Sequence, residues 1–127
     1  NGSFNNSLVT DDQLRELYNS AKIILIPLKD VYQPSGQSVA LQAMSCGKTV
    51  VISNTIGLFD KVHLIDGHNI IFVEPESKES LNIKIEYLLK QNDKRRTIGK
   101  LARNTVIENF TIKHMSDCLN EILEKIK

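Results

Sequence analysis

The sequence predicts an α/β fold in which a doubly wound parallel sheet carries helices on both faces. Three short, uninterrupted runs of branched apolar residues have the composition of strands buried on both faces. Helical segments precede the first run, separate it from the second and follow the third, an alternation that builds parallel sheets through right-handed crossovers. We therefore expect strands at 23–28, 49–52 and 70–73.

The first helix is expected to begin directly after Thr10. Thr10-Asp11-Asp12-Gln13 has the pattern of a capping box, in which the Thr hydroxyl and the Gln side chain satisfy free backbone amides. The apolar residues behind it recur at helical spacing and predict one buried face, made of Leu14, Leu17, Tyr18 and Ala21. Residues 1–10 are polar and aperiodic, so we expect a loop or an ordered tail there.

The first strand should end at Pro27, because proline cannot donate a hydrogen bond to a sheet ladder. A helix is then expected over Gln37–Cys46. Gly47 follows it and is suited to the left-handed conformation that ends many helices. The second strand begins shortly after that glycine.

Residues 53–57 are expected to form a loop, and residues 58–62 a short helical turn. Asp66-Gly67 marks a tight turn before the third strand.

Three helices complete the chain. Ser77 and Thr111 are expected to cap the first and the last, and the middle one begins at Asn92 or Asp93. The inward faces of the first two are predicted to hold Leu81, Ile85, Leu88, Leu89, Ile98, Leu101, Ala102 and Thr105. The last helix has a long apolar stripe, made of Met115, Cys118, Leu119, Ile122, Leu123 and Ile126. We expect this stripe to leave apolar area exposed or to pair with a second copy.

Composition excludes several classes of protein. The 127 residues suit a single domain spanning 1–127, and a net charge of +1 gives no general attraction to nucleic acid. The two cysteines, Cys46 and Cys118, are far apart in sequence, and no His/Cys cluster has the spacing of metal ligands. No apolar run approaches the roughly 20 residues that span a bilayer. We therefore expect a cytoplasmic protein with reduced thiols and no bound metal.

The most informative segment for function is the loop between the first strand and the following helix. Ligands of open α/β sheets bind beyond the carboxyl ends of the strands. There, Gln33-Pro34-Ser35-Gly36-Gln37-Ser38 leads directly into a helix whose first amides, from Gly36 to Val39, have no partner within the helix. These amides, the helix dipole and the hydroxyls of Ser35 and Ser38 predict a diphosphate site. The alternative is that Ser35 only caps the helix and Gly36 only relieves crowding.

Residues 33–53, QPSGQSVALQAMSCGKTVVIS, resemble a conserved region of retaining glycosyltransferases of the GT-B fold, family 4 type. Residues 43–51 match the second half of that family's E-A-M-A-C-G-x-P-V-V pattern. The similarity extends to 12–27, 54–75 and 96–110, which is nearly the whole chain. The resemblance implies a Rossmann-like, C-terminal donor-binding domain, truncated at its start and ending in several helices.

The resemblance also implies an activity. The intact enzyme would transfer a sugar from a nucleotide-diphosphate sugar to a glycan or lipid-linked acceptor, with retention at the anomeric carbon and without a required cofactor. An acceptor-binding N-terminal domain, and the Arg and Lys that neutralise the donor phosphates, are expected upstream of this chain, which alone should be inactive. A lipid-linked acceptor would bring the enzyme to the periphery of a membrane.

The resemblance places individual residues as well. The segment from Ser35 through Gly36, Gln37 and Ser38 to Val39 would receive the diphosphate. Gln42 would bind the ribose at a position where the family has a glutamate. A second family glutamate, eight positions earlier, falls on Pro34, and Asp30 is the candidate to replace it as a catalytic carboxylate. Gly57 and Leu58 would lie near the base or phosphates, although Gly57 is equally well explained as a turn glycine.

Two other functions remain open. The missing carboxylate favours a non-catalytic domain that binds nucleotides or sugar phosphates. A receiver-like signalling domain would need an aspartate after a middle strand, whereas Ser53-Asn54 follows the second strand. His63, His68 and His114 are interpreted as surface or structural residues.

Overall fold

The computed structural model describes residues 9–126. The expected loop or tail at 1–10 therefore lies outside the described residues, except for Val9 and Thr10. The helices and strands, in chain order, are α2 (Asp11–Ser20), β1 (Ile23–Ile26), α3 (Gln37–Ser45), β2 (Thr49–Ser53), β3 (Ile71–Val73), α4 (Lys78–Leu89), α5 (Asn92–Asn109) and α6 (Ile112–Lys125).

The three strands form one parallel sheet in the order β1-β2-β3. Ile23 lies opposite Thr49, and Ile52 lies opposite Phe72. Every residue of the central strand β2 is buried. Helices pack on both faces of this sheet, so the predicted α/β, Rossmann-like fold class is confirmed.

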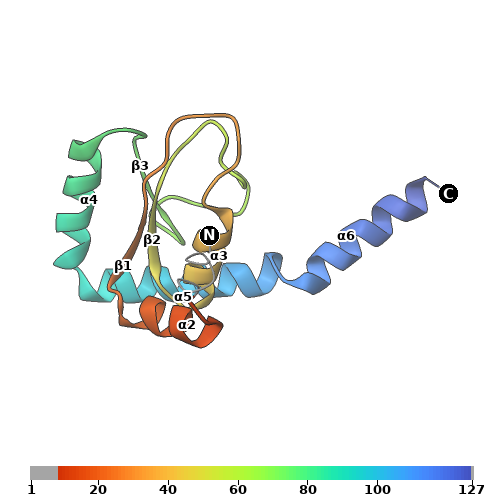
Figure 1. Ribbon diagram of the computed structural model, residues 1–127, viewed down its shortest axis with the longest axis horizontal. Coiled ribbons are helices and arrows are strands. Elements are labelled where there is room, and N and C mark those ends of the chain that lie inside the picture. The colour runs from red at the N-terminus through yellow and green to blue at the C-terminus, as the bar shows by residue number, and fades with distance from the viewer. Residues whose placement is uncertain (1–8, 127) are drawn as a thin grey trace, which may run out of the picture.

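The sheet separates two apolar cores. Helix α4 lies on one side of the strands and α3 on the other (Figure 1). Met44 of α3 packs with Val50 and Ile52 of β2 on one face. Leu88 of α4 packs with Val51 of β2 on the other face. Because side chains alternate along a strand, consecutive residues of β2 serve opposite cores. Helix α5 contributes to both, through Ala102 and Ile98 respectively.

The predicted helix signals are largely present. The Thr10 hydroxyl accepts from the Gln13 amide at 3.1 Å, and the Gln13 side chain accepts from the Thr10 amide at 3.0 Å, which confirms the capping box. Ser77 and Thr111 cap α4 and α6 as expected. Strand β1 ends at Ile26, directly before Pro27.

Helices α3 and α5 meet at two glycines. Gly47 ends α3 with φ 74°, as predicted for a left-handed stop. A Cβ atom added to Gly99 of α5 would lie less than 3.0 Å from the carbonyl group of Gly47. The absence of a side chain at Gly99 therefore sets how closely these helices pack.

Three predicted core residues are exposed instead. Leu25 is 42% exposed, Leu17 59% and Leu89 47%. The prediction for Leu25 was wrong: within residues 9–126, β1 is an edge strand, and its Leu25 side is incompletely covered. On α2 and α4 the buried faces are narrower than the apolar periodicity suggests, since Tyr18 is the one buried residue of α2 and Leu88 that of α4.

The helical turn expected at 58–62 is absent, and bends take its place. The Asp60 carboxylate accepts hydrogen bonds from the Val62 amide at 2.9 Å and the His63 amide at 2.6 Å. An aspartate that bonds to the backbone just after it favours a turn over a continuing helix. The expected Asp66-Gly67 turn is confirmed, with Gly67 at φ 76°.

Asp60 makes stability depend on pH. Partial burial alone would raise the pKa of its carboxyl, but the hydrogen bonds from His63 and the Val62 amide outweigh burial and lower that pKa. A carboxyl whose pKa is lower in the folded chain stabilises it above about pH 4, and the contribution is lost as the pH falls through the folded-state pKa. Asp60→Asn should therefore flatten the fall in melting temperature below pH 4.

The matched control for this prediction is Asp117→Asn. Asp117 pairs with Lys113 on the exposed surface of α6, where an ion pair contributes little to stability. If the melting temperature of Asp60→Asn fell below pH 4 as steeply as that of the parent chain, the role given to the Asp60 carboxylate would be wrong.

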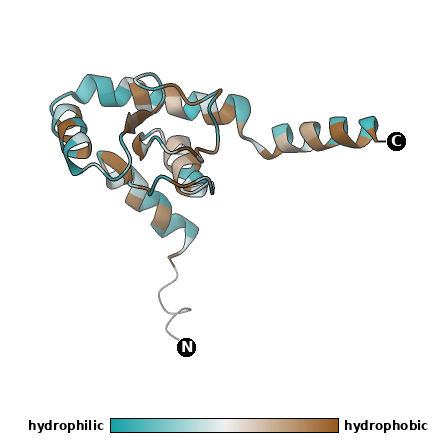
Figure 2. Ribbon diagram, turned by 90° about the horizontal axis from the view of Figure 1, so that it is seen from above, coloured by the Kyte–Doolittle hydropathy of each residue, from teal (hydrophilic) through white to brown (hydrophobic). Residues whose placement is uncertain are grey.

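Helix α6 extends away from the rest of the chain (Figure 1), and its apolar stripe is visible as alternating brown patches in Figure 2. The whole stripe is exposed, including Leu119, Ile122 and Leu123. The expectation of exposed apolar area is confirmed. Within residues 9–126, no helix has the length and apolar character needed to cross a membrane.

Candidate functional site

The loops that follow the three strands meet at the carboxyl edge of the sheet, because all the strands are parallel. The amide of Leu28, after β1, donates to the Ser53 hydroxyl at the end of β2 at 2.8 Å. The amide of Asn54 donates to the Val73 carbonyl at 2.9 Å and joins β2 to the end of β3. The predicted ligand loops are thus held together by hydrogen bonds of their own.

Asp30 belongs to this loop network. Its Oδ1 accepts from the Ile56 amide at 2.8 Å, which ties the loop after β1 to the loop after β2. The residue is exposed, but one carboxylate oxygen already has a backbone partner. The structure therefore gives Asp30 a role in loop geometry, while its catalytic role stays a prediction.

Gly57 lies beneath the loop after β1. A Cβ atom at this position would come within 3.0 Å of the carbonyl oxygens of Val31 and Tyr32. Gly57 is buried, and the neighbouring Leu58 packs against the core next to α3. The glycine is therefore more than a turn residue, since it permits a close approach of two backbones at the predicted ligand edge.

Gly36 sets the start of α3. It is the N-cap with φ 74°, and a Cβ atom here would lie 2.8 Å from Cγ2 of Ile26. No side chain caps this helix, so the alternative in which Ser35 is the cap is wrong. Both the left-handed backbone and the close packing on β1 require glycine here.

The first amides of α3 remain open. The first helical bond runs from the Ala40 amide to the Gly36 carbonyl at 2.9 Å, so the amides of Gln37, Ser38 and Val39 precede the helical ladder. Within residues 9–126 they have no hydrogen-bond partner, and neither do the Ser35 and Ser38 hydroxyls. Ser35 and Ser38 are exposed, so this end of the helix faces solvent with several unpaired donors.

Gln42 lies one turn further along α3, on the side of α2. It is exposed, and its Oε1 accepts from the Tyr18 hydroxyl at 3.0 Å. Both residues line a hollow of about 160 Å³ between the two helices, which is lined by Asp11, Leu14, Arg15, Tyr18, Gln42, Ser45 and Cys46. The sequence predicted Tyr18 only as a core residue, and the spacing within α2 gave no signal of its contact with α3.

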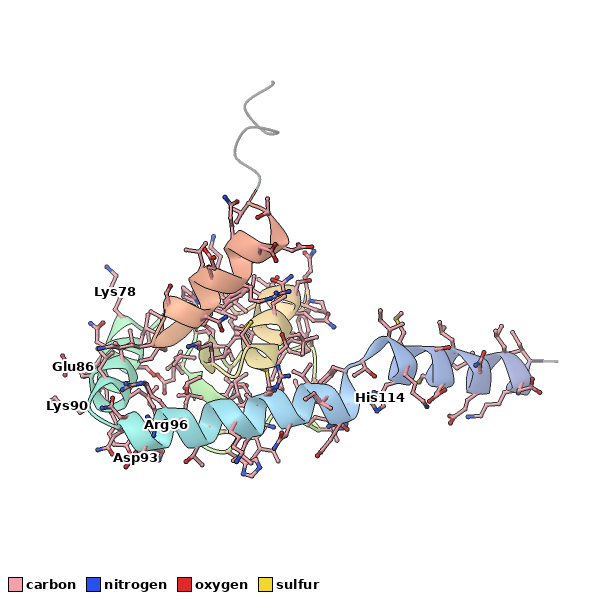
Figure 3. All side chains as sticks on the ribbon, turned by 90° about the horizontal axis from the view of Figure 1, so that it is seen from below. Lys78, Glu86, Lys90, Asp93, Arg96 and His114 are labelled. Atoms are coloured by element: carbon pink, nitrogen blue, oxygen red, sulfur yellow. The ribbon has the colours of Figure 1, made fainter. Side chains whose placement is uncertain are left out.

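A second hollow, of about 370 Å³, lies at the opposite edge of the sheet, where β1 and β2 begin. Four cationic side chains line it, those of Lys22, Lys48, Arg95 and Arg96, and no carboxylate does. It is the larger of the two hollows, but none of the residues predicted to bind the ligand lines it. Figure 3 shows Arg96 near the start of α5, beside Asp93.

The histidines have structural or surface positions. His63 pairs with Asp60 at 2.9 Å and packs edge-on against the Phe110 ring. His114 lies in the first turn of α6, well away from the sheet (Figure 3), and His68 is exposed in a turn. Within residues 9–126, no three His, Cys, Asp or Glu side chains lie together as a metal site.

The sequence pattern of the family described as glycosyl transferases group 1 matches residues 7–105. The chain belongs to this family. A glycosyltransferase of Methanocaldococcus jannaschii is 35% identical over 104 residues, which are 81% of this chain and 25% of that relative. Membership in the group 1 family excludes the alternative of a receiver-like signalling domain.

Two solved structures share the fold. The chain superposes on HepE of Anabaena, solved in complex with UDP, with a TM-score of 0.76 and 22% identity over 87% of this chain and 29% of that one. A glycosyltransferase of Rickettsia africae gives a TM-score of 0.75 and 26% identity over 92% of this chain and 30% of that one. The chain thus spans less than a third of the length of these relatives.

Proposed function

We propose that this chain is a single domain that binds the nucleotide-sugar donor of a glycosyltransferase. Family membership supports the reaction class, and the HepE structures contain UDP or UDP-glucose in a protein of the same fold. The observation that carries the proposal is the start of α3, where the amides of Gln37, Ser38 and Val39 are open at the carboxyl edge of the sheet.

The donor diphosphate binds at this helix end. The helix dipole favours an anion there by roughly 0.3–1 kcal/mol, and by up to about 2 kcal/mol in a partly buried site. Ser35 and Ser38 add hydroxyl donors, and Gln42 binds the ribose one turn below. When the sugar leaves, negative charge grows on the diphosphate, and one fixed donor aimed at such charge contributes about 3 kcal/mol to lowering the barrier.

The remaining parts of the proposal concern the whole enzyme. Transfer proceeds with retention, in a GT-B enzyme of family 4 type whose N-terminal domain binds a glycan or lipid-linked acceptor. Gly57 and Leu58 border the base or phosphates, and no cofactor is required besides the donor. The chain by itself binds donor weakly and does not turn it over.

A second candidate function is a domain that binds nucleotides or sugar phosphates without catalysis. Pro34 and Gln42 are neutral where the family has carboxylates, and Asp30 is engaged with the Ile56 amide. An assay of the full-length protein would separate the two functions. Sugar transfer from the donor would show catalysis, whereas nucleotide binding without sugar transfer or donor hydrolysis would favour this alternative.

Thermal unfolding with UDP-, GDP- and ADP-sugars tests donor binding directly. A ligand that binds only the folded chain stabilises it by about 2.7 kcal/mol at 100 times its dissociation constant. We expect one nucleotide class to raise the melting temperature more than the other two. The proposal fails if none of the three does so at millimolar concentration.

Ser38→Ala locates the binding site. A hydrogen bond to a charged group contributes about 1.5–3 kcal/mol, so the variant should bind the preferred nucleotide at least about tenfold more weakly. Ser116→Ala is the matched control, because Ser116 is an exposed serine on α6 that does not line the hollow between the start of α6 and Gln37 of α3. Equal affinities of the two variants would place the diphosphate elsewhere.

A further inference from the structure

The contact between Tyr18 and Gln42 joins a rigid residue to a flexible one. Tyr18 is only 7% exposed, and its ring belongs to the core beneath α2 and α3. Gln42 is an exposed glutamine on α3, a residue type that has many rotamers when nothing holds it. The hydrogen bond of 3.0 Å between them therefore restricts Gln42 much more than Tyr18.

This hydrogen bond joins a buried tyrosine to an exposed glutamine. Tyr18 and Gln42 both line the hollow between α2 and α3. What the bond does fix is the direction of the Gln42 amide. Its Oε1 is held by Tyr18, which leaves the two Nε2 hydrogens free to donate to a ligand.

Tyr18 is well suited to act as the donor in this pair. Burial raises the pKa of its hydroxyl, and the electrostatic effect of the nearby Cys46 raises it further. The hydroxyl thus stays protonated over the neutral range and donates to the Gln42 oxygen.

We propose that Tyr18 is a positioning residue, which holds Gln42 so that its Nε2 donors meet the ribose hydroxyls of the donor nucleotide. This inference rests on the proposed function and adds a residue on α2 to a site otherwise built from α3 and the loops. Holding the side chain before binding lowers the entropy lost on binding, which is how preorganisation raises affinity. Removal of the Tyr18 hydroxyl should weaken nucleotide binding without any direct contact to the ligand.

The test measures binding of UDP, 2′-deoxy-UDP and pyrophosphate by calorimetry to the parent chain, Tyr18→Phe, Gln42→Ala and the double variant. Tyr18→Phe keeps the buried ring and removes only the hydroxyl. We expect it to bind UDP about three- to tenfold more weakly, the effect of one hydrogen bond, with pyrophosphate binding unchanged. The double variant should bind UDP no more weakly than Gln42→Ala alone, because Tyr18 acts through Gln42.

The matched control is Tyr87→Phe, which removes the hydroxyl of an exposed tyrosine that contacts Lys94 on the other side of the sheet. A purely structural role of Tyr18 would lower affinity for UDP and pyrophosphate alike, and this result would overturn the inference. So would additive losses in the double variant, or equal losses for UDP and 2′-deoxy-UDP in Tyr18→Phe. Failure of the parent chain to bind any of the three probes would instead overturn the proposed function, and the role of Tyr18 with it.

Discussion

Gly99→Ala is expected to destabilise the chain more than alanine at any other glycine within residues 9–126. The new Cβ would lie less than 3.0 Å from the Gly47 carbonyl oxygen and carbon, which are backbone atoms at the end of α3. Alanine favours a helix over glycine by about 1 kcal/mol. Overpacking against a rigid neighbour costs about 1–3 kcal/mol and occasionally more, and a Cβ atom this close to a backbone oxygen belongs at the upper end of that range, at about 3–4 kcal/mol, so the cost exceeds the helix-propensity gain.

We expect the free energy of unfolding to fall by about 2–3 kcal/mol, which for a chain of this size lowers the melting temperature by roughly 10 °C. Thermal unfolding followed by circular dichroism measures this change. Lys100→Ala is the control, because Lys100 is the next residue of α5 and is exposed. Gly99→Ala unfolding at or above the temperature of this control would show that α3 and α5 do not pack as described.

Gly57→Ala has the second largest expected effect, and it acts on both stability and binding. Its Cβ would collide with the carbonyl groups of Val31 and Tyr32, so the loops after β1 and β2 would have to separate. These loops move more easily than two packed helices, so we expect a loss of about 1–2 kcal/mol in stability. Their separation should also strain the hydrogen bond between Asp30 and the Ile56 amide.

Because the same loop leads into α3, nucleotide affinity should fall more than stability alone explains. Gly67→Ala separates the two effects. Gly67 has φ 76° but open space around it, so alanine there costs only backbone strain of about 1–2 kcal/mol. Calorimetry with UDP should show weaker binding for Gly57→Ala and parental binding for Gly67→Ala, and the reverse order would refute the role of the loop contact.

Local signals predicted the elements of this fold well. The capping boxes and left-handed glycines act over a few residues, so Thr10, Ser77 and Gly47 marked helix ends correctly. Exposure depends on distant neighbours. Leu25 has the sequence context of a central strand, yet its strand lies at the sheet edge, which no pattern within that strand reveals.

In the candidate site, too, local features were predictable from the sequence and contacts between distant segments were not. The open start of α3 was predictable, because a small-residue loop that leads into a helix leaves free amides wherever it occurs. The contacts of Gly57 with Val31 and of Tyr18 with Gln42 were not, since each joins segments far apart in sequence. A helical turn was wrongly predicted at 58–62. Its apolar pattern suits a helix, but the hydrogen bonds that Asp60 accepts from the Val62 and His63 amides favour a different backbone conformation.

A nuclear magnetic resonance titration of the ¹⁵N-labelled chain with UDP tests the central claim most directly. If the diphosphate binds at the start of α3, the largest shift changes will be those of the Gln37, Ser38 and Val39 amides. Changes centred instead on the cationic hollow at the other sheet edge, around Lys48 and Arg95, or the absence of change at these three amides, would contradict the account.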